Sequence, residues 1–432
     1  GGFMSYIILG FQTTTVQRTG HPSVFRTGYF DFGSGNPAAY GIGGYKDIMK
    51  LIAEDPVLKP MIAVITPSVT LFGIAGNFDI DASKTFFGSG VVPSDREHMR
   101  QWNEYHLSGA PRPKNDLGLR DDDPTRGVIG VGLARVLGLC EKLKVADCPA
   151  PPKSADANAP PTETGKELTA LAEEDRAGEV KETHGNLPRI DLLAATAGGA
   201  PNVLSLYVGE AERQGVKELD DSFIAMHIDL AQQLLYGRGE HKTVGIVVQL
   251  HRTEDMKAAR ARMNALFKDK GLELEVRDFA ELQPQYNQVI GLFGAIFSFI
   301  AVIMGVIVLF TVVNTMSMSV MERTNEIGTA RAMGVRRWGI RRQFLLEGWM
   351  LGAIGSTLGL IAAAVLGFLI NHAGLTWTPP GQAAAVPLRL LVSGGPLLLG
   401  TWIGLVIMAT IASMVPANRA AKMQVVDALR HV

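Results

Sequence analysis

The chain has 432 residues and a mean hydropathy of +0.15, and its 41 Lys and Arg nearly balance its 42 Asp and Glu. A net charge of −1 gives no bulk positive field for a polyanion, so we expect no nucleic-acid partner. The charges are unevenly divided, because residues 286–432 hold 10 basic and 4 acidic residues and the preceding part holds 31 and 38. An acidic, polar part joined to a basic, apolar one argues against an ordinary water-soluble globule.

The chain opens with an apolar stretch, GGFMSYIILG, that is too short to cross a bilayer core of about 30 Å. We interpret residues 1–10 as the outer end of a first transmembrane helix whose beginning is missing from this chain. A short amphipathic segment leading into the next domain is the alternative.

Residues 11–288 are predicted to form a large mixed α+β extracytoplasmic domain. Short runs rich in β-branched residues predict strands, and apolar spacings of three and four predict helices. The expected strands are Met61–Thr66, Val244–Leu250 and Leu272–Val276, and the expected helices are Phe223–Tyr236 and Asp255–Lys268.

An insertion is expected over residues 149–190, which are rich in Pro and Ala and then acidic. The only two cysteines of the chain, Cys140 and Cys148, precede it or fall at its edge. An oxidising compartment would allow them to form a disulfide, and two free thiols remain the alternative. Their spacing matches no zinc motif, and we expect no metal site.

Common nucleotide-binding motifs are missing from the sequence. It contains no GxxxxGK[ST] phosphate loop, so we expect no ATP hydrolysis and no cofactor in this chain. The glycines of Gly127–Gly132 have the wrong order for a dinucleotide motif and indicate a turn into a helix. A Ser/His/Asp triad assembled from distant positions stays open.

Three charge-free segments are long enough to span a membrane. A buried helix in a large soluble core is the alternative for each of them. The predicted transmembrane helices are residues 289–313, 349–370 and 390–415.

Orientation follows from the charges of the connecting loops. Six arginines fall in residues 314–348, and the tail 416–432 is also basic, whereas residues 371–389 contain a single arginine. By the positive-inside rule, the first two segments face the cytoplasm. Residues 371–389 and everything before residue 289 then face outward.

The cytoplasmic loop carries an unusual pattern, ERTNEIGTARAMGVRR, over residues 322–337. Glu322 and Glu326 share one face of any helix there and repel each other unless a cation lies opposite. Arg323 could supply that cation from within the loop. The functional interpretation is a docking surface for a basic partner. The composition does not distinguish this interpretation from an ion pair inside the loop.

This loop, together with QFLLEG at residues 343–348, resembles the signature of the MacB/FtsX-type ABC permeases, which include the lipoprotein-releasing permeases LolC and LolE. The tail PANRAA at 416–421 with VDALR at 426–430 is similar to the family's ending, although a usual proline is replaced near Gln424. GVGLARVLG at 130–138 is similar to an outer-domain motif of the family.

The resemblance implies four spans with a large periplasmic domain between the first and second, in a bacterial inner membrane. It implies that two cytoplasmic ATPase subunits bind ATP and Mg, that a second permease copy forms a homodimer, and that the complex works by mechanotransmission. The membrane lipid and a periplasmic carrier, adaptor or outer-membrane lipoprotein would be further partners.

The resemblance implies that this cytoplasmic loop is the site that couples the permease to the ATPase. Small residues would allow close approach to a groove of the ATPase, and arginines 336, 337, 341 and 342 would lie near lipid headgroups. The expected ATPase-coupling residues are Glu322, Arg323, Glu326, Ile327, Gly328, Arg331, Ala332, Met333 and Gly334.

The implied activity is extraction of a lipoprotein or another amphipathic cargo. MacB-like efflux of peptides or antibiotics, and FtsX-like regulation of a cell-wall hydrolase, are the alternatives. An outer domain of this size is larger than FtsX normally has, which favours transport.

Overall fold

The computed structural model describes residues 2–33, 35–78, 80–107, 118–145, 187–214, 217–377, 386–391 and 395–424. The chain divides into two compact units. The sheet unit comprises Leu9–Pro284 and Thr378–Val386, and the helical unit comprises Gly1–Ile8, Gln285–Trp377 and Pro387–Val432.

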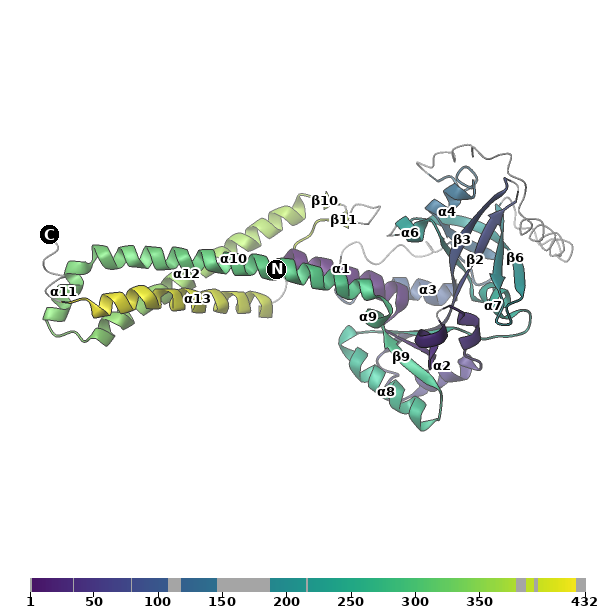
Figure 1. Cartoon of the computed structure of the whole chain (residues 1–432), viewed down its shortest axis with the longest axis horizontal. Helices are drawn as coiled ribbons and strands as arrows, with labels where there is room; N and C mark the ends of the chain where they lie inside the picture. The colour runs from purple at the N-terminus through teal and green to yellow at the C-terminus, as the bar shows by residue number, and fades with distance from the viewer. Residues whose placement is uncertain are drawn as a thin grey trace. The chain divides into compact units, whose positions relative to one another are not determined.

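The sheet unit is built on nine hydrogen-bonded strands in the order β3-β7-β4-β6-β5-β2-β8-β1-β9. In the described part of the chain, β2 also pairs with β3, so that six of these strands close into a barrel (Figure 1). The strands are β1 (Pro22–Arg26), β2 (Ile62–Asn77), β3 (Ala82–Val91), β4 (Arg126–Gly130), β5 (Arg189–Ala195), β6 (Pro201–Glu212), β7 (Phe223–His227), β8 (Gly245–Leu250) and β9 (Leu274–Asp278).

The barrel core is filled by large apolar side chains from alternate strand positions, including Leu71, Phe86, Ile129 and Leu206. Glycines occupy the interior positions of the barrel where there is no room for a side chain. A Cβ on Gly127, for example, would lie 2.7 Å from Cγ of Leu206. The alternation of inward apolar and outward residues therefore sets the register of the barrel.

Strand β2 is shared between the barrel and a smaller sheet. Its first half pairs with β8 from Ile62 to Ser68, and its second half pairs with β3 from Val69 to Asn77. Helices α2 (Tyr45–Glu54) and α8 (Met256–Asp269) contribute the buried residues of a second core, among them Ile52, Met263 and Phe267.

Further helices of the sheet unit are short. They are the π-helix η1 (Tyr29–Gly33), the 3₁₀ turns η2 (Pro37–Tyr40) and η3 (Thr253–Asp255), and the α-helices α3 (Pro93–Arg100), α4 (Val131–Val136), α6 (Lys217–Asp220), α7 (Ile228–Tyr236) and α9 (Phe279–Leu282).

Two sequence predictions need correction in this unit. The helix expected over Phe223–Tyr236 is strand β7 followed by α7, because a continuous apolar run does not distinguish a buried strand from a helix. The insertion expected over 149–190 ends earlier, since Arg189 and Ile190 already belong to β5 and Ile190 is buried. Residues 149–186 lie outside the described part of the chain.

The first helix differs in length from its prediction. Helix α1 covers Gly2–Thr19, so it runs nine residues beyond the expected 1–10. Its last turns carry Thr13, Thr15, Val16 and Gln17 as buried residues, which shows that this half packs as part of the sheet unit.

In the described part of the chain, the helical unit contains the start of α1 and four further helices, α10 (Pro284–Glu322), α11 (Thr324–Ala332), α12 (Arg337–His372) and α13 (Gly395–Lys422). Of these, α10, α12 and α13 are long and apolar enough to cross a membrane, which confirms three helices of the predicted type. The described residues contain no fourth helix of this kind, so the expected count of four is not confirmed. Strands β10 (Thr376–Trp377) and β11 (Val386–Pro387) pair between α12 and α13.

Helices α12 and α13 pack through small residues. A Cβ on Gly352 would lie 2.8 Å from Cβ of Ala409, and a Cβ on Gly348 would collide with the side chain of Ser413. The sequence contains another GxxxG pair on α12, Gly355 and Gly359, and a Cβ at either position would meet nothing within 4 Å. Close helix contact in an apolar solvent depends on such small residues, and here Gly348 and Gly352 supply it.

Candidate functional site

The predicted coupling residues lie at the end of the helical unit where α10, α11, α12 and α13 meet. Helix α11 follows directly on α10, and a short turn joins it to α12. Side chains from all four helices form one apolar cluster, which we call the elbow core. Its buried members are Met316, Val320, Ile327, Ile340, Phe344, Ala417 and Ala420.

Two predicted contact residues belong to this interior. Ile327 is only 5% exposed, and Gly328 is buried beside it. Both are therefore used to attach α11 to the chain's own helices. Their apolar character in the motif has a packing reason, and they are not available to a partner without unfolding α11.

Arg331 ties α11 to α13. Its guanidinium donates to the carbonyl oxygen of Ala421 at 3.4 Å and also to that of Met423. These carbonyls lie at the C-terminal end of α13, where the last turn of a helix leaves carbonyl groups without intrahelical partners. A cation there also interacts favourably with the helix dipole. Arg331 thus caps α13 from a neighbouring helix.

Arg323 forms a second contact between helices, an ion pair with α12. Its Nη1 lies 3.0 Å from Oε1 of Glu347. A pairing of Arg323 with Glu326 inside the loop was the alternative to a docking surface, and the structure shows a pair with Glu347 instead. This ion pair joins the two halves of the family-like signature, because Arg323 belongs to the ERTNEIG segment and Glu347 to the FLLEG segment.

Glu322 and Glu326 are both exposed. Among the residues that the structure describes, neither forms an ion pair. Ala332 and Met333, at the other end of α11, are exposed as well. The acidic residues and the C-terminal end of α11 are therefore free to meet another molecule.

Gly334 ends α11 in a left-handed conformation, with φ of +97°. The amide of Val335 donates to the carbonyl of Ala330 at 3.1 Å, and the amide of Gly334 donates to that of Arg331 at 3.1 Å. This pair of bonds is a Schellman motif, which favours glycine at the left-handed position. A Cβ there would meet nothing within 4 Å, so the backbone angle, and not close packing, requires glycine.

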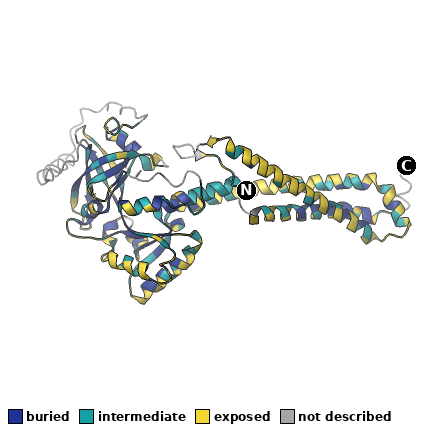
Figure 2. Ribbon diagram, turned by 180° about the vertical axis from the view of Figure 1, so that it is seen from behind, coloured by how far each residue is buried: buried dark blue, intermediate teal, exposed yellow. Residues whose placement is uncertain are grey.

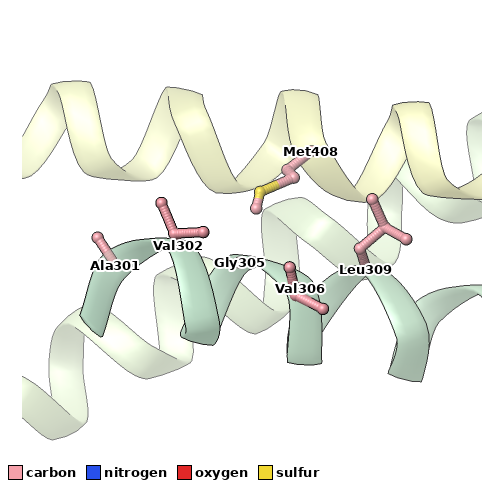
Figure 3. Close-up of a pocket in the computed structure, with 6 residues that line it drawn as sticks. All are labelled: Ala301, Val302, Gly305, Val306, Leu309 and Met408. Carbon is pink, nitrogen blue, oxygen red and sulfur yellow. The ribbon is translucent and has the colours of Figure 1, made fainter. Parts of the chain in front are cut away.

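A shallow apolar groove lies between α10 and α13 (Figure 3). Met408 of α13 points toward α10, and a Cβ on Gly305 would lie 2.8 Å from its Cε. The groove is lined by Ala301, Val302, Gly305, Val306, Leu309 and Met408. It contains no polar side chain that could orient a ligand, so it is a packing feature.

One possible catalytic arrangement occurs in the sheet unit and is excluded by its hydrogen bonds. Nε2 of His21 lies 3.1 Å from Oγ1 of Thr253, which donates to Glu104. Nδ1 of His21, however, accepts the backbone amide of Leu250 at 3.0 Å. Nε2 must then carry the proton and donate it to Thr253, so His21 cannot act as a base on that hydroxyl. Burial lowers the pKa of His21 to about 3, which keeps the ring neutral.

The glycine-rich Gly127–Gly132 segment, expected to be a turn into a helix, is instead the end of strand β4 followed directly by α4. Asp220 occupies the helix start, where its carboxylate accepts the amides of Val131 and Gly132, both at 3.1 Å. An anion bound by those amides would have to displace a carboxylate.

The remaining predictions concern the two cysteines, a metal site and the C-terminal tail. Cys140 is described and Cys148 lies outside the described residues, so their disulfide stays a prediction. Within the described ranges, no three His, Cys, Asp or Glu residues are placed to hold a metal ion. The tail from residue 425 onward is likewise outside the description.

Comparison with known families identifies the helical part. Residues 297–425 match the family described as FtsX-like permease C-terminal. They include the last two-thirds of α10, all of α11 and α12, and α13. Residues 297–425 are therefore an FtsX-like permease domain, which confirms the resemblance drawn from the motifs in this part of the chain.

Curated relatives agree with that assignment. The chain is 30% identical over 193 residues to the macrolide export ATP-binding/permease protein MacB of Neisseria gonorrhoeae, covering 44% of this chain and 28% of MacB. It is 38% identical over 141 residues to the ABC transporter permease YtrF of Bacillus subtilis, covering 30% of each. The chain thus spans less than a third of the length of these two relatives.

Two solved structures with a likeness to this chain are those of extracellular or periplasmic domains. The extracellular domain of the ABC-type transporter YknZ covers 59% of this chain and 98% of its own, at 13% identity and a TM-score of 0.31. The periplasmic region of MacB from Actinobacillus actinomycetemcomitans covers 63% and 95%, at 11% identity and a TM-score of 0.32.

Proposed function

We propose that this chain is the permease subunit of a MacB- or LolCDE-like ABC complex. In this proposal a separate cytoplasmic ATPase binds ATP and Mg and hydrolyses the nucleotide, and the permease transmits the resulting movement to its outer domain. The FtsX-like permease domain at residues 297–425 supports the class of protein. The mechanism rests on the contacts of α11.

The observation that carries the proposal is that α11 is fastened to α10, α12 and α13 at once. Ile327 packs in the elbow core, Arg331 holds the end of α13, and Arg323, at the junction with α10, pairs with Glu347 of α12. A short helix fixed in this way cannot move alone. A force applied to α11 from the cytoplasm would displace all three long helices together, as a shear of packed elements.

The cargo and setting follow from the same family type. We propose a lipoprotein or other amphipathic cargo, handled at the bacterial inner membrane by a homodimer of this chain with two ATPase subunits. A periplasmic carrier, adaptor or outer-membrane lipoprotein would receive it. Efflux is the second candidate, because the relative from Neisseria gonorrhoeae is named as a macrolide exporter.

The test is reconstitution of the chain in lipid nanodiscs with a candidate ABC ATPase subunit from the same organism. The permease should retain the ATPase and change its hydrolysis rate, and Glu326→Lys should weaken retention because it reverses an exposed charge on α11. Glu54→Lys, a matched reversal on an exposed site of the sheet unit, should have no effect. Normal retention and activity with Glu326→Lys in a correctly inserted protein would contradict the coupling role of α11.

A further inference from the structure

Four arginines at the start of α12 have no counter-charge within the described part of the chain. They are Arg336, Arg337, Arg341 and Arg342. None of their side chains forms an ion pair or a hydrogen bond with another described residue. Nε of Arg341 is buried and lacks a hydrogen-bond partner there. This short segment therefore concentrates positive charge that the described residues do not balance.

The helix dipole makes this placement more costly. Arg336 is the N-cap of α12 and Arg337 is its first residue, and among the described residues no side chain caps this end. The start of a helix carries a partial positive charge, so cations there are destabilising and anions are favoured. The exposed carboxylates of Glu322 and Glu326 belong to the end of α10 and to α11, and in the described structure they pair with none of the four arginines. An anion from outside the chain would offset this cost.

An indole lies beside one of these arginines. The guanidinium carbon of Arg342 lies 5.6 Å from the ring centre of Trp338, which is 67% exposed. Stacking of this kind orients a guanidinium and leaves its N–H groups available to a second, anionic partner. Arg341 and Arg342 are consecutive, and their side chains are long enough to reach one phosphate group. The planar fork of a guanidinium matches the geometry of a phosphate.

Beyond the arginines, the same side of α12 becomes apolar. Leu346 and Trp349 are 51% and 47% exposed, and they lie four and seven positions after Arg342. At about 1.5 Å per residue, Trp349 is roughly 10 Å farther along the helix axis than Arg342. Glu347, which lies between them, is already paired with Arg323. Tryptophan is typical of the level where headgroups meet acyl chains. A cationic segment followed by an exposed apolar one matches the order of phosphate and acyl chains in a phospholipid.

We infer that the start of α12 is a binding site for an anionic phospholipid, with the phosphate between Arg341 and Arg342 and the acyl chains beside Leu346 and Trp349. Trp338 orients Arg342 for that contact. From the sequence, these arginines are expected near lipid headgroups, and the structure adds a pair of phosphate ligands, an orienting indole and an acyl-chain contact. The site requires no ATPase, so it stands apart from the proposed function.

The experiment measures lipid binding to the full chain in neutral detergent by native mass spectrometry. Phosphatidylglycerol should bind more tightly than phosphatidylcholine, whose headgroup has no net charge. The double variant Arg341→Gln with Arg342→Gln should weaken phosphatidylglycerol binding about 30-fold, as expected for the loss of two cations at an anionic lipid. Arg342→Lys keeps the charge but loses the planar contact with Trp338, and it should weaken binding about threefold.

Two controls distinguish a specific site from general attraction. Arg389→Gln removes an exposed arginine from the loop that is predicted to face outward, and it should leave phosphatidylglycerol binding unchanged. Excess inorganic phosphate should not displace the lipid, because a free phosphate makes no contact with Leu346 or Trp349.

Four results would overturn the inference. The double variant could bind phosphatidylglycerol as tightly as the unaltered chain, which would leave the arginines to an acidic protein surface. Arg389→Gln could weaken binding equally, which would indicate general attraction. Phosphatidylcholine could bind as tightly as phosphatidylglycerol. Inorganic phosphate could displace the lipid, which would assign the site to a soluble phosphate. If the double variant does not fold, Arg342→Lys decides, because unchanged binding in that variant also overturns the inference.

Discussion

Away from the elbow core, the two units of this chain bury different kinds of residue. In the sheet unit the interior holds Leu71, Phe86 and Phe267, and in the helical unit large side chains such as Phe310 point outward while Gly348 and Ser413 lie at the helix contact (Figure 2). Folding in water buries apolar area, whereas helices in lipid gain nothing by burying it and associate through close packing instead. Outside the elbow core, the same residue types thus have opposite structural roles in the two units.

Buried polar groups also differ between the units. In the sheet unit they bond to backbone atoms deep inside, as where Nε1 of Trp102 donates to the carbonyl of Leu250 at 2.9 Å and Gln249 donates to that of Met99 at 3.1 Å. In the helical unit, charged side chains join different elements at the elbow, through Arg323–Glu347 and the contacts of Arg331, and Nε1 of Trp402 on α13 donates to Oγ1 of Thr357 on α12 at 3.0 Å. Small residues and this neutral bond hold α12 and α13 along their length, and charged side chains act at one end.

The largest effect should come from filling the α12–α13 contact. Gly348→Leu places a side chain where Ser413 already lies, and overpacking of this kind costs about 3 kcal/mol. Gly355→Leu on the same helix adds identical bulk at a position with nothing within 4 Å. Disulfide trapping between cysteines introduced on α12 and α13 should fail for the first variant and persist for the second. Equal trapping in both would show that close packing does not hold this pair.

Removing the Arg331 cap should have the next largest effect. Arg331→Ala leaves carbonyls at the end of α13 without their charged donor, which costs about 2 kcal/mol for a charge-assisted bond. Hydrogen exchange of α11 should then increase. Arg342→Ala, which removes an exposed arginine of the same loop, is the control and should leave that exchange unchanged. Unaltered exchange in Arg331→Ala would mean that the elbow core alone fixes α11.

The buried histidine predicts a pH dependence confined to the sheet unit. The pKa of His21 is about 3 in the folded chain and 6.5 when exposed, so between these values only the unfolded chain binds the proton. Stability is therefore complete above pH 6.5 and falls as the pH decreases, by about 1.4 kcal/mol at pH 5.5. Exchange of the β8 amides, corrected for intrinsic rate, measures it. His21→Gln should abolish this pH-dependent part, and a persistent slope in that variant would assign it to other groups.

The smallest effect should follow from changing Gly334. An alanine there must adopt a left-handed conformation, at a cost of about 1 kcal/mol, whereas Gly334→Asn should cost less because asparagine tolerates that region. Proteolysis at the turn between α11 and α12 should be faster for the alanine variant only. Equal proteolysis rates for both variants would indicate that a contact of Gly334, and not its backbone angle, requires glycine.

Most of the helical unit could be predicted from the sequence. Charge-free runs of this length have few alternatives, and α10, α12 and α13 contain the three predicted segments except at residues 390–394. The choice between two GxxxG pairs could not be made, because Gly348–Gly352 and Gly355–Gly359 have the same spacing and only the position of α13 distinguishes them. The strand β7 was mistaken for a helix because its run of apolar residues has no period to identify it.

For the candidate site, the sequence alone selected the segment that we propose for ATPase coupling. The motif at residues 322–348 and its resemblance to a permease family were sufficient for that, and the match over residues 297–425 confirms the family type. Only the tertiary structure decided the role of each residue. Ile327 faces inward, Arg323 pairs with Glu347 and Arg331 caps α13, while Met333 and Trp338 remain exposed. The physical reason is that spacing along a helix fixes which residues share a face, but the neighbours packed against that face come from distant parts of the chain.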